Sequence, residues 1–141
     1  MPVSSLMLPV FIQVALTFAV LLWAARLRMQ ALRSGAAKPS DVALRQPNWP
    51  PHVLQVANSY QNELELPMLF YAVVAFILIT STNSIIFVVL AWVFVISRLV
   101  RAFIHTGSNV VRLRGAAFGV GVITLAAMWV ILAVRILATG A

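Results

Sequence analysis

Four polar side chains recur at helical spacing just before a long apolar run. They are Gln55, Asn58, Asn62 and Glu65. At about 100° per residue they share one helix face. Amides and a carboxylate on one face can bind the amine and amide groups of a small ligand. Glu63 points well away from this face, and we expect it to be solvated or interfacial.

A second polar stripe is mainly basic and runs from the third apolar segment into the connection that follows. Its members are Arg98, Arg101, His105, Asn109 and Arg112. A guanidinium can bind a carboxylate through two parallel hydrogen bonds, so this stripe suits an anion. Because a fixed cation favours the charged form of a thiol, Arg112 is also a candidate to stabilise a thiolate. Ionisable groups beside hydrocarbon are costly, and their presence at both stripes indicates function.

Each of these groups also has a structural interpretation. Glu65 can pair with Arg98, the deepest arginine, in an ion pair that only fixes helix packing. Arg101 and Arg112 can extend to lipid phosphates. His105 can be a hydrogen-bonding or packing residue. The residue types alone leave these alternatives open.

The composition indicates that helices in a membrane must position the stripes. The chain has 141 residues, of which 62% are hydrophobic and 9% charged, with a mean hydropathy of +1.00. A soluble domain would carry about 25% charged residues. The length allows four spans of about 20 residues in one domain, 1–141, and predicts an all-α bundle of four transmembrane helices. The predicted spans are about 6–27, 53–80, 85–104 and 113–137.

The distribution of basic residues predicts the orientation. Of the ten lysines and arginines, five flank the first connection, about 33–51, and four flank the third, which leaves Arg135 on the other side. The positive-inside rule makes the nine-residue side cytoplasmic, with both termini on the non-cytoplasmic side. Both polar stripes then face the cytoplasm. Because the basic residues lie beside apolar spans, we expect membrane lipids as partners and no nucleic acid.

Several classes of chemistry are excluded or disfavoured. The chain has no cysteine, so a disulfide or a cysteine nucleophile is impossible. The two histidines have no carboxylates at metal-binding spacing, and we predict no metal. The motif Gly115-x-x-x-Gly119, followed by Gly121, permits close helix approach and gives weak support for an oligomer.

Two segments resemble the MAPEG family, the membrane-associated proteins in eicosanoid and glutathione metabolism. Residues 62–71, NELELPMLFY, resemble its second-helix signature of an Asn, a Glu three residues on and a Pro soon after. Residues 98–118 resemble its third helix, cytoplasmic loop and the start of its fourth helix. The arginines seven residues on either side of His105 are similar to those of the leukotriene-synthase branch. The resemblance covers about residues 6–138 and is closest to short bacterial members.

The resemblance implies a left-handed four-helix bundle that forms a homotrimer in the bacterial inner membrane, with glutathione at subunit interfaces on the cytoplasmic face. Asn62 and Glu65 would bind the glutamyl end of glutathione, and Arg112 would face the sulfur. The residues lining the peptide and carboxylates would be Arg98, Arg101 and His105. We expect Gln55, Asn58 and Asn109 to complete the binding stripes.

The implied activity is that of a glutathione transferase or peroxidase acting on a lipophilic electrophile or lipid hydroperoxide. The sequence departs from the family at Asn58, where members that bind glutathione usually carry an arginine. A tyrosine is common in the family where His105 and Asn109 stand. The alternative functions are a non-catalytic scaffold that binds lipid and a structural subunit of a membrane complex.

Overall fold

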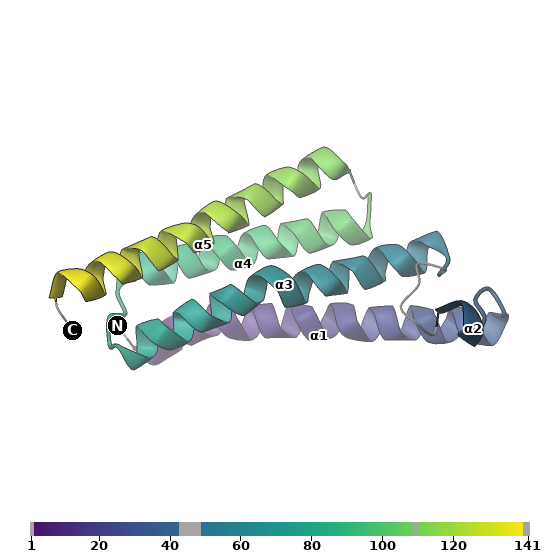
Figure 1. The fold of residues 1–141 in the computed structure, drawn as a ribbon, viewed down its shortest axis with the longest axis horizontal. Coiled ribbons are helices and arrows are strands. Elements are labelled where there is room, and N and C mark those ends of the chain that lie inside the picture. The colour runs from purple at the N-terminus through teal and green to yellow at the C-terminus, as the bar shows by residue number, and fades with distance from the viewer. Residues whose placement is uncertain (1, 43–48, 109, 140–141) are drawn as a thin grey trace.

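The structure, a computed structural model, describes residues 2–42, 49–108 and 110–139, and every regular element in them is a helix. Four helices are long and apolar enough to cross a membrane. Helix α1 begins and α5 ends at the same end of the bundle, where the turn between α3 and α4 also lies (Figure 1). The chain is therefore a four-helix bundle. The five helices are α1 (Val3–Ser34), α2 (Pro39–Val42), α3 (Pro51–Ile79), α4 (Ile85–Thr106) and α5 (Val111–Thr139).

The long helices continue beyond the apolar runs. At 1.5 Å per residue, the 32 residues of α1 reach about 48 Å, which exceeds a hydrocarbon core of about 30 Å. Helix α1 ends at Gly35, whose φ of 78° is the left-handed conformation that glycine adopts at helix ends. The short α2 lies within the connection predicted over 33–51. Arg45, one of the basic residues of that connection, lies outside the described residues.

The main apolar core lies in the half of the bundle nearest the α3–α4 turn. It is built from all four long helices, and its aromatic centre is the stacked pair Phe70 and Phe94, with ring centroids 4.5 Å apart. Their fully buried neighbours include Ile77 of α3 and Met128 of α5. The other half of the bundle, toward α2, holds the polar groups of the two stripes.

Helices α4 and α5 approach closely at Gly121. A Cβ atom placed there would lie 3.1 Å from Ser97 Oγ and 3.8 Å from side-chain atoms of Leu66 and Phe94. At Gly115 and Gly119 a Cβ atom would meet nothing within 4 Å. The close contact within the chain therefore falls at Gly121, whereas the two glycines of the predicted motif face open space.

Large apolar side chains cover much of the outer surface. Phe11 is 60% exposed, Leu22 66% and Phe103 81%. Lipid tails can solvate such side chains, whereas a soluble monomer rarely exposes broad apolar patches. The exposed surface and the four long apolar helices fit an integral, multi-pass membrane protein.

Candidate functional site

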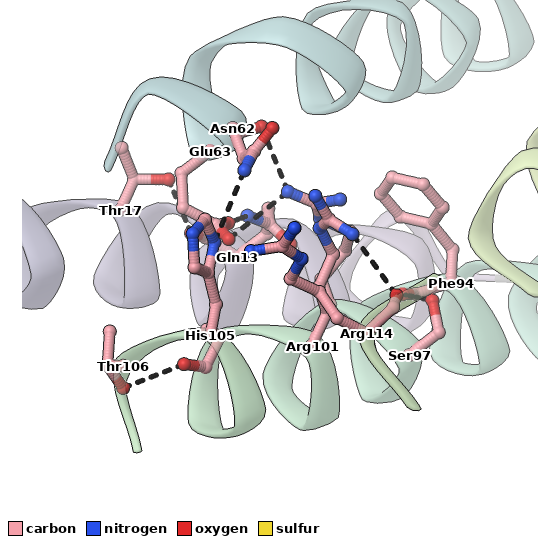
Figure 2. Close-up of polar contacts among 12 residues, drawn as sticks. Gln13, Thr17, Asn62, Glu63, Phe94, Ser97, Arg101, His105, Thr106 and Arg114 are labelled. Atoms are coloured by element: carbon pink, nitrogen blue, oxygen red, sulfur yellow. Dashed lines mark hydrogen bonds and ion pairs between the residues drawn. The ribbon is translucent and has the colours of Figure 1, made fainter. Parts of the chain in front are cut away.

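A buried ion pair joins α3 to α4 near the middle of the helices. Glu63 Oε1 lies 3.2 Å from Arg98 Nη2, and each side chain is only 1% exposed. Gln13 of α1 donates from Nε2 to the second carboxylate oxygen, Glu63 Oε2, at 2.7 Å. Arg98 Nη2 also donates to the backbone carbonyl of Asn62 at 2.9 Å. Figure 2 shows Gln13, Glu63 and Asn62 converging on one point from two helices.

The expectation that Arg98 pairs with Glu65 is wrong, as is the expectation that Glu63 is solvated or interfacial. Glu63 is 2% exposed, whereas Glu65 lies in the exposed class. Two residues along a helix rotate the side chain by about 200°, so these carboxylates face opposite sides of α3. The face of Glu63 meets α1 and α4, and the face of Glu65 lies at the surface of the chain.

The polar stripe of α3 therefore lies at the border between buried and exposed surface. Asn58 and Glu65 are exposed, and Gln55 and Asn62 are half-buried. Gln55 Nε2 donates to the carbonyl oxygens of His105, at 2.7 Å, and Gly107, at 3.1 Å. These carbonyls belong to the end of α4, where a helix leaves carbonyl groups without helical partners. Gln55 thus caps α4.

Asn62 connects the α3 stripe to the basic stripe. Its Nδ2 lies 3.3 Å from Nδ1 of His105, which is 5% exposed. If the Asn62 amide donates, His105 Nδ1 is unprotonated and the ring proton is on Nε2. The contact brings a residue of each predicted stripe together (Figure 2).

Arg101 is the second buried arginine of α4, at 9% exposure. It donates from Nη1 to the carbonyl oxygen of Arg114 at 3.1 Å, and its guanidinium carbon lies 4.8 Å from the ring centroid of Phe118. Both contacts fix the guanidinium against α5. The aromatic face attracts the cation, and the attraction is stronger where water is excluded.

A pocket of about 240 Å³ lies between α3 and α5 and is lined by Asn62, Glu65, Leu66, Leu69 and Phe118. We call it the α3–α5 pocket. In Figure 1, α5 diverges from α3 toward the end where α5 begins. The pocket has apolar walls, an amide and a carboxylate, and the ring of Phe118 also contacts Arg101. It can hold a ligand that has both polar and apolar parts.

The two buried arginines have spare hydrogen-bond donors. Among the described residues, Arg98 Nε, Arg98 Nη1 and Arg101 Nε have no hydrogen-bond partner although they are buried. Buried polar groups without partners are rare because each costs free energy. Arg98 binds the backbone of Asn62 and Arg101 lies on Phe118, so each arginine contacts a residue that lines the pocket, although neither arginine lines it directly. Carboxylate groups of a ligand would suit them.

Two further predicted site residues are Arg112 and Asn109, and Arg112 is not among the described residues that line the pocket. Arg112 lies in the first turn of α5 with an exposed side chain. Asn109 lies outside the described residues. In the part of the chain that the structure describes, no three His, Cys, Asp or Glu side chains form a group that could hold a metal ion.

The polar residues that sequence reasoning missed are Gln13 and Glu63. Gln13 is fully buried and stands alone among apolar residues in the middle of the first span. A single amide at that depth needs a hydrogen-bond partner from another helix, and this signal was present in the sequence. For Glu63 the helical spacing relative to Glu65 was correct, but spacing does not reveal which face meets the other helices.

Comparison with known proteins agrees with the architecture. The model of the MAPEG family matches residues 6–134, which include all four long helices except their outermost residues. No curated protein and no solved structure matches the chain. The match covers nearly the whole chain, and it includes both polar stripes, the buried ion pair and the α3–α5 pocket. The chain therefore belongs to the MAPEG family.

Proposed function

We propose that this protein binds glutathione in the membrane and uses its thiolate on a lipophilic electrophile or a lipid hydroperoxide. The observation that carries the proposal is the α3–α5 pocket, two of whose lining residues, Asn62 and Phe118, contact buried arginines that have free donors. Glutathione has two carboxylates, an amine, two amides and a thiol. The free donors of Arg98 and Arg101 match a carboxylate, and Asn62 and Glu65 match the amide and amine groups. Membership of a glutathione-linked family supports the same ligand.

For this chemistry the protein needs to position the two reactants and to place a positive charge near the sulfur. A cation near the sulfur stabilises the thiolate, and we assign this role to Arg112. In a transfer reaction, the sulfur forms a bond to an electrophilic carbon, and a leaving group departs or the adduct takes up a proton. In a peroxidase reaction, two glutathione molecules are oxidised to the disulfide while the hydroperoxide is reduced to an alcohol and water. The bilayer supplies the apolar substrate laterally, and fixed placement lowers the barrier.

The pocket is open at the surface of the chain, and this supports a homotrimer with glutathione at subunit interfaces. Glu65 lines the pocket, and Asn58 lies about one turn of α3 before Asn62; both are exposed and available to a second copy. Asn109 and Gln55 remain candidates to contact the ligand from the connection and from α3. We further propose that this end of the bundle faces the cytoplasm, since it carries nearly all of the basic residues.

A second candidate function is a non-catalytic scaffold that binds lipid. A groove of about 310 Å³ lies at the other end of the helices, and its lining is almost wholly apolar. A lipid tail fits such a surface, and Asn58 in place of an arginine would weaken glutathione capture. A purely structural role in a larger complex is the third possibility. The residues of this distal groove are Phe76, Thr80, Trp129, Leu132, Ala133, Ile136 and Leu137.

The test is a glutathione titration of the detergent-purified protein, followed by thiolate absorbance in the ultraviolet and by the midpoint of thermal unfolding. We expect a saturable thiolate signal in the wild type, lost in Arg112→Ala with binding retained. We expect Glu65→Ala to weaken binding. Arg33→Ala, an exposed arginine at the far end of α1, is the matched control. A wild type with neither thiolate signal nor thermal stabilisation by glutathione would favour the scaffold.

A further inference from the structure

The buried network of Gln13, Glu63 and Arg98 joins three helices at mid-span. Gln13 lies in α1, Glu63 in α3 and Arg98 in α4, and all three side chains are at most 2% exposed. Neither Gln13 nor Glu63 is among the residues that line the α3–α5 pocket. Because both lie outside the lining, their effect on a ligand would be indirect, through the contacts that they make with each other and with Arg98.

Packing alone does not account for this network. Moving two charges away from water has a large free-energy cost, and proteins with well-packed apolar residues of similar volume in their place are often as stable or more stable. An ionisable residue within a membrane span therefore suggests a function, and its interaction partner indicates which function. Here the partners are Gln13, Glu63 and Arg98, and their contacts fix the position of the Arg98 guanidinium.

Arg98 is held through a single nitrogen. Nη2 makes both contacts, to Glu63 Oε1 at 3.2 Å and to the carbonyl of Asn62 at 2.9 Å. This arrangement leaves Nε and Nη1 without a partner among the described residues. The guanidinium is held at Nη2 by the Glu63 carboxylate and the Asn62 carbonyl, while Nε and Nη1 stay available.

The same nitrogen also acts on α3 next to the pocket. Pro67 has no N–H, and its ring crowds the carbonyl four residues earlier, that of Glu63, so this turn of α3 has lost a regular hydrogen bond. In membrane helices, side chains from neighbouring helices help to satisfy backbone groups around a proline. Arg98 supplies a donor at this turn, to the carbonyl of Asn62. The Asn62 side chain lines the pocket and reaches His105.

We propose that Glu63 and Gln13 are positioning residues of the α3–α5 pocket. Gln13 orients the Glu63 carboxylate, Glu63 orients Arg98, and Arg98 holds the turn of α3 that presents Asn62. The consequence for ligand binding rests on the proposed function. The positioning itself does not depend on glutathione and has its own measurement.

The ligand-binding test compares Glu63→Ala, Glu63→Gln and a core control, Ile77→Ala, which removes a fully buried side chain of α3 outside the pocket. We expect Glu63→Ala to raise the Kd for glutathione by about tenfold, the effect of one lost charge-assisted contact. Glutamine keeps the length and an acceptor for Arg98, and its amide can donate to the free Gln13 Oε1. Glu63→Gln should therefore restore the Kd to within about threefold of wild type, although the buried cation is then unpaired.

Ile77→Ala separates positioning from general loss of stability. It should lower the midpoint of thermal unfolding while the Kd stays at the wild-type value. If Glu63→Ala is folded and binds glutathione as the wild type does, the proposal is wrong. If Glu63→Ala does not fold, Gln13→Leu removes the orienting amide but keeps the charge pair. That variant should raise the Kd by about threefold, and an unchanged Kd overturns the proposal.

A ligand-free readout distinguishes this proposal from the proposed function. In protein labelled with 15N-arginine, the buried Nε–H of Arg98 should give a slowly exchanging resonance, assigned by its loss in Arg98→Lys. We expect Glu63→Gln to keep the resonance and Glu63→Ala to broaden or shift it. A resonance unchanged in Glu63→Ala overturns the positioning role. Failure of the wild type to bind glutathione overturns only the proposed function.

Discussion

The guanidinium carbon of Arg101 lies 4.8 Å from the centre of the Phe118 ring, so that a buried cation of α4 rests on an aromatic wall contributed by α5. The contact places a positive charge on the ring of a residue that lines the α3–α5 pocket. It also links α4 to α5 near the end of the bundle where α5 begins (Figure 1).

Replacing Phe118 should separate the contribution of its aromatic face to stability from that of its apolar area. Phe118→Leu removes the aromatic face but keeps an apolar side chain, and we expect a loss of about 0.5–2 kcal/mol of stability. Phe118→Tyr keeps the face and should be close to neutral. The midpoint of thermal unfolding in detergent measures both variants. Equal midpoints for the leucine and tyrosine variants would show that the ring contributes only apolar area.

Arg135 should be important for stability and not for the α3–α5 pocket. Its Nη1 donates to the carbonyl of Thr82, at 3.2 Å, and to Ser84 Oγ, at 2.7 Å, and its guanidinium carbon lies 4.9 Å from the Phe87 ring centroid. Arg135→Met removes two hydrogen bonds and a cation–π contact, and should cost about 1–3 kcal/mol. Thermal unfolding should reveal this loss while the glutathione Kd stays unchanged. A raised Kd would show that the two ends of the bundle are coupled.

The glycines of α5 should differ sharply in their tolerance of larger side chains. Gly121→Val would force atoms into Ser97 and the neighbouring core and should cost about 1–3 kcal/mol. Gly115→Ala meets open space within the chain and should not destabilise the isolated subunit, because alanine favours a helix. Thermal unfolding compares the folds, and sedimentation gives the oligomeric state. A change of oligomeric state in Gly115→Ala would place that glycine at a subunit interface.

Gln55 should slow amide hydrogen exchange at the C-terminal end of α4. Gln55→Glu replaces the donating amide by a carboxylate that cannot donate to the carbonyls of His105 and Gly107. We expect faster amide hydrogen exchange over residues 103–107 in this variant, with the rest of α4 unchanged. The matched control is Asn58→Asp, one turn along the same helix and exposed. Equal exchange in the two variants would contradict the capping role.

The four membrane helices were predictable because apolar runs of sufficient length leave few alternatives. The orientation of each helix about its own axis was not. Helical spacing places Glu63 and Glu65 on opposite faces of α3, but the number of polar residues on a face does not show which face meets the other helices. The structure places Glu63 inward, against Gln13 and Arg98. In a membrane both faces of a helix can be polar where helices meet, so pattern within one helix does not identify its neighbour.

The apolar core is distributed unevenly along the bundle, and local separation of the helices should follow that distribution. The packed aromatic and aliphatic cluster ties the helices together near the α3–α4 turn, whereas polar contacts and a pocket occupy the half toward α2. Free energies of local opening follow the density of buried apolar contacts. Both ends have a hollow between α3 and α5, but only the end with the distal groove is backed by the main apolar core, so we expect local opening of these two helices at the α3–α5 pocket first. A molecule dissolved in the bilayer would enter between them sideways, without unfolding the protein or passing through water.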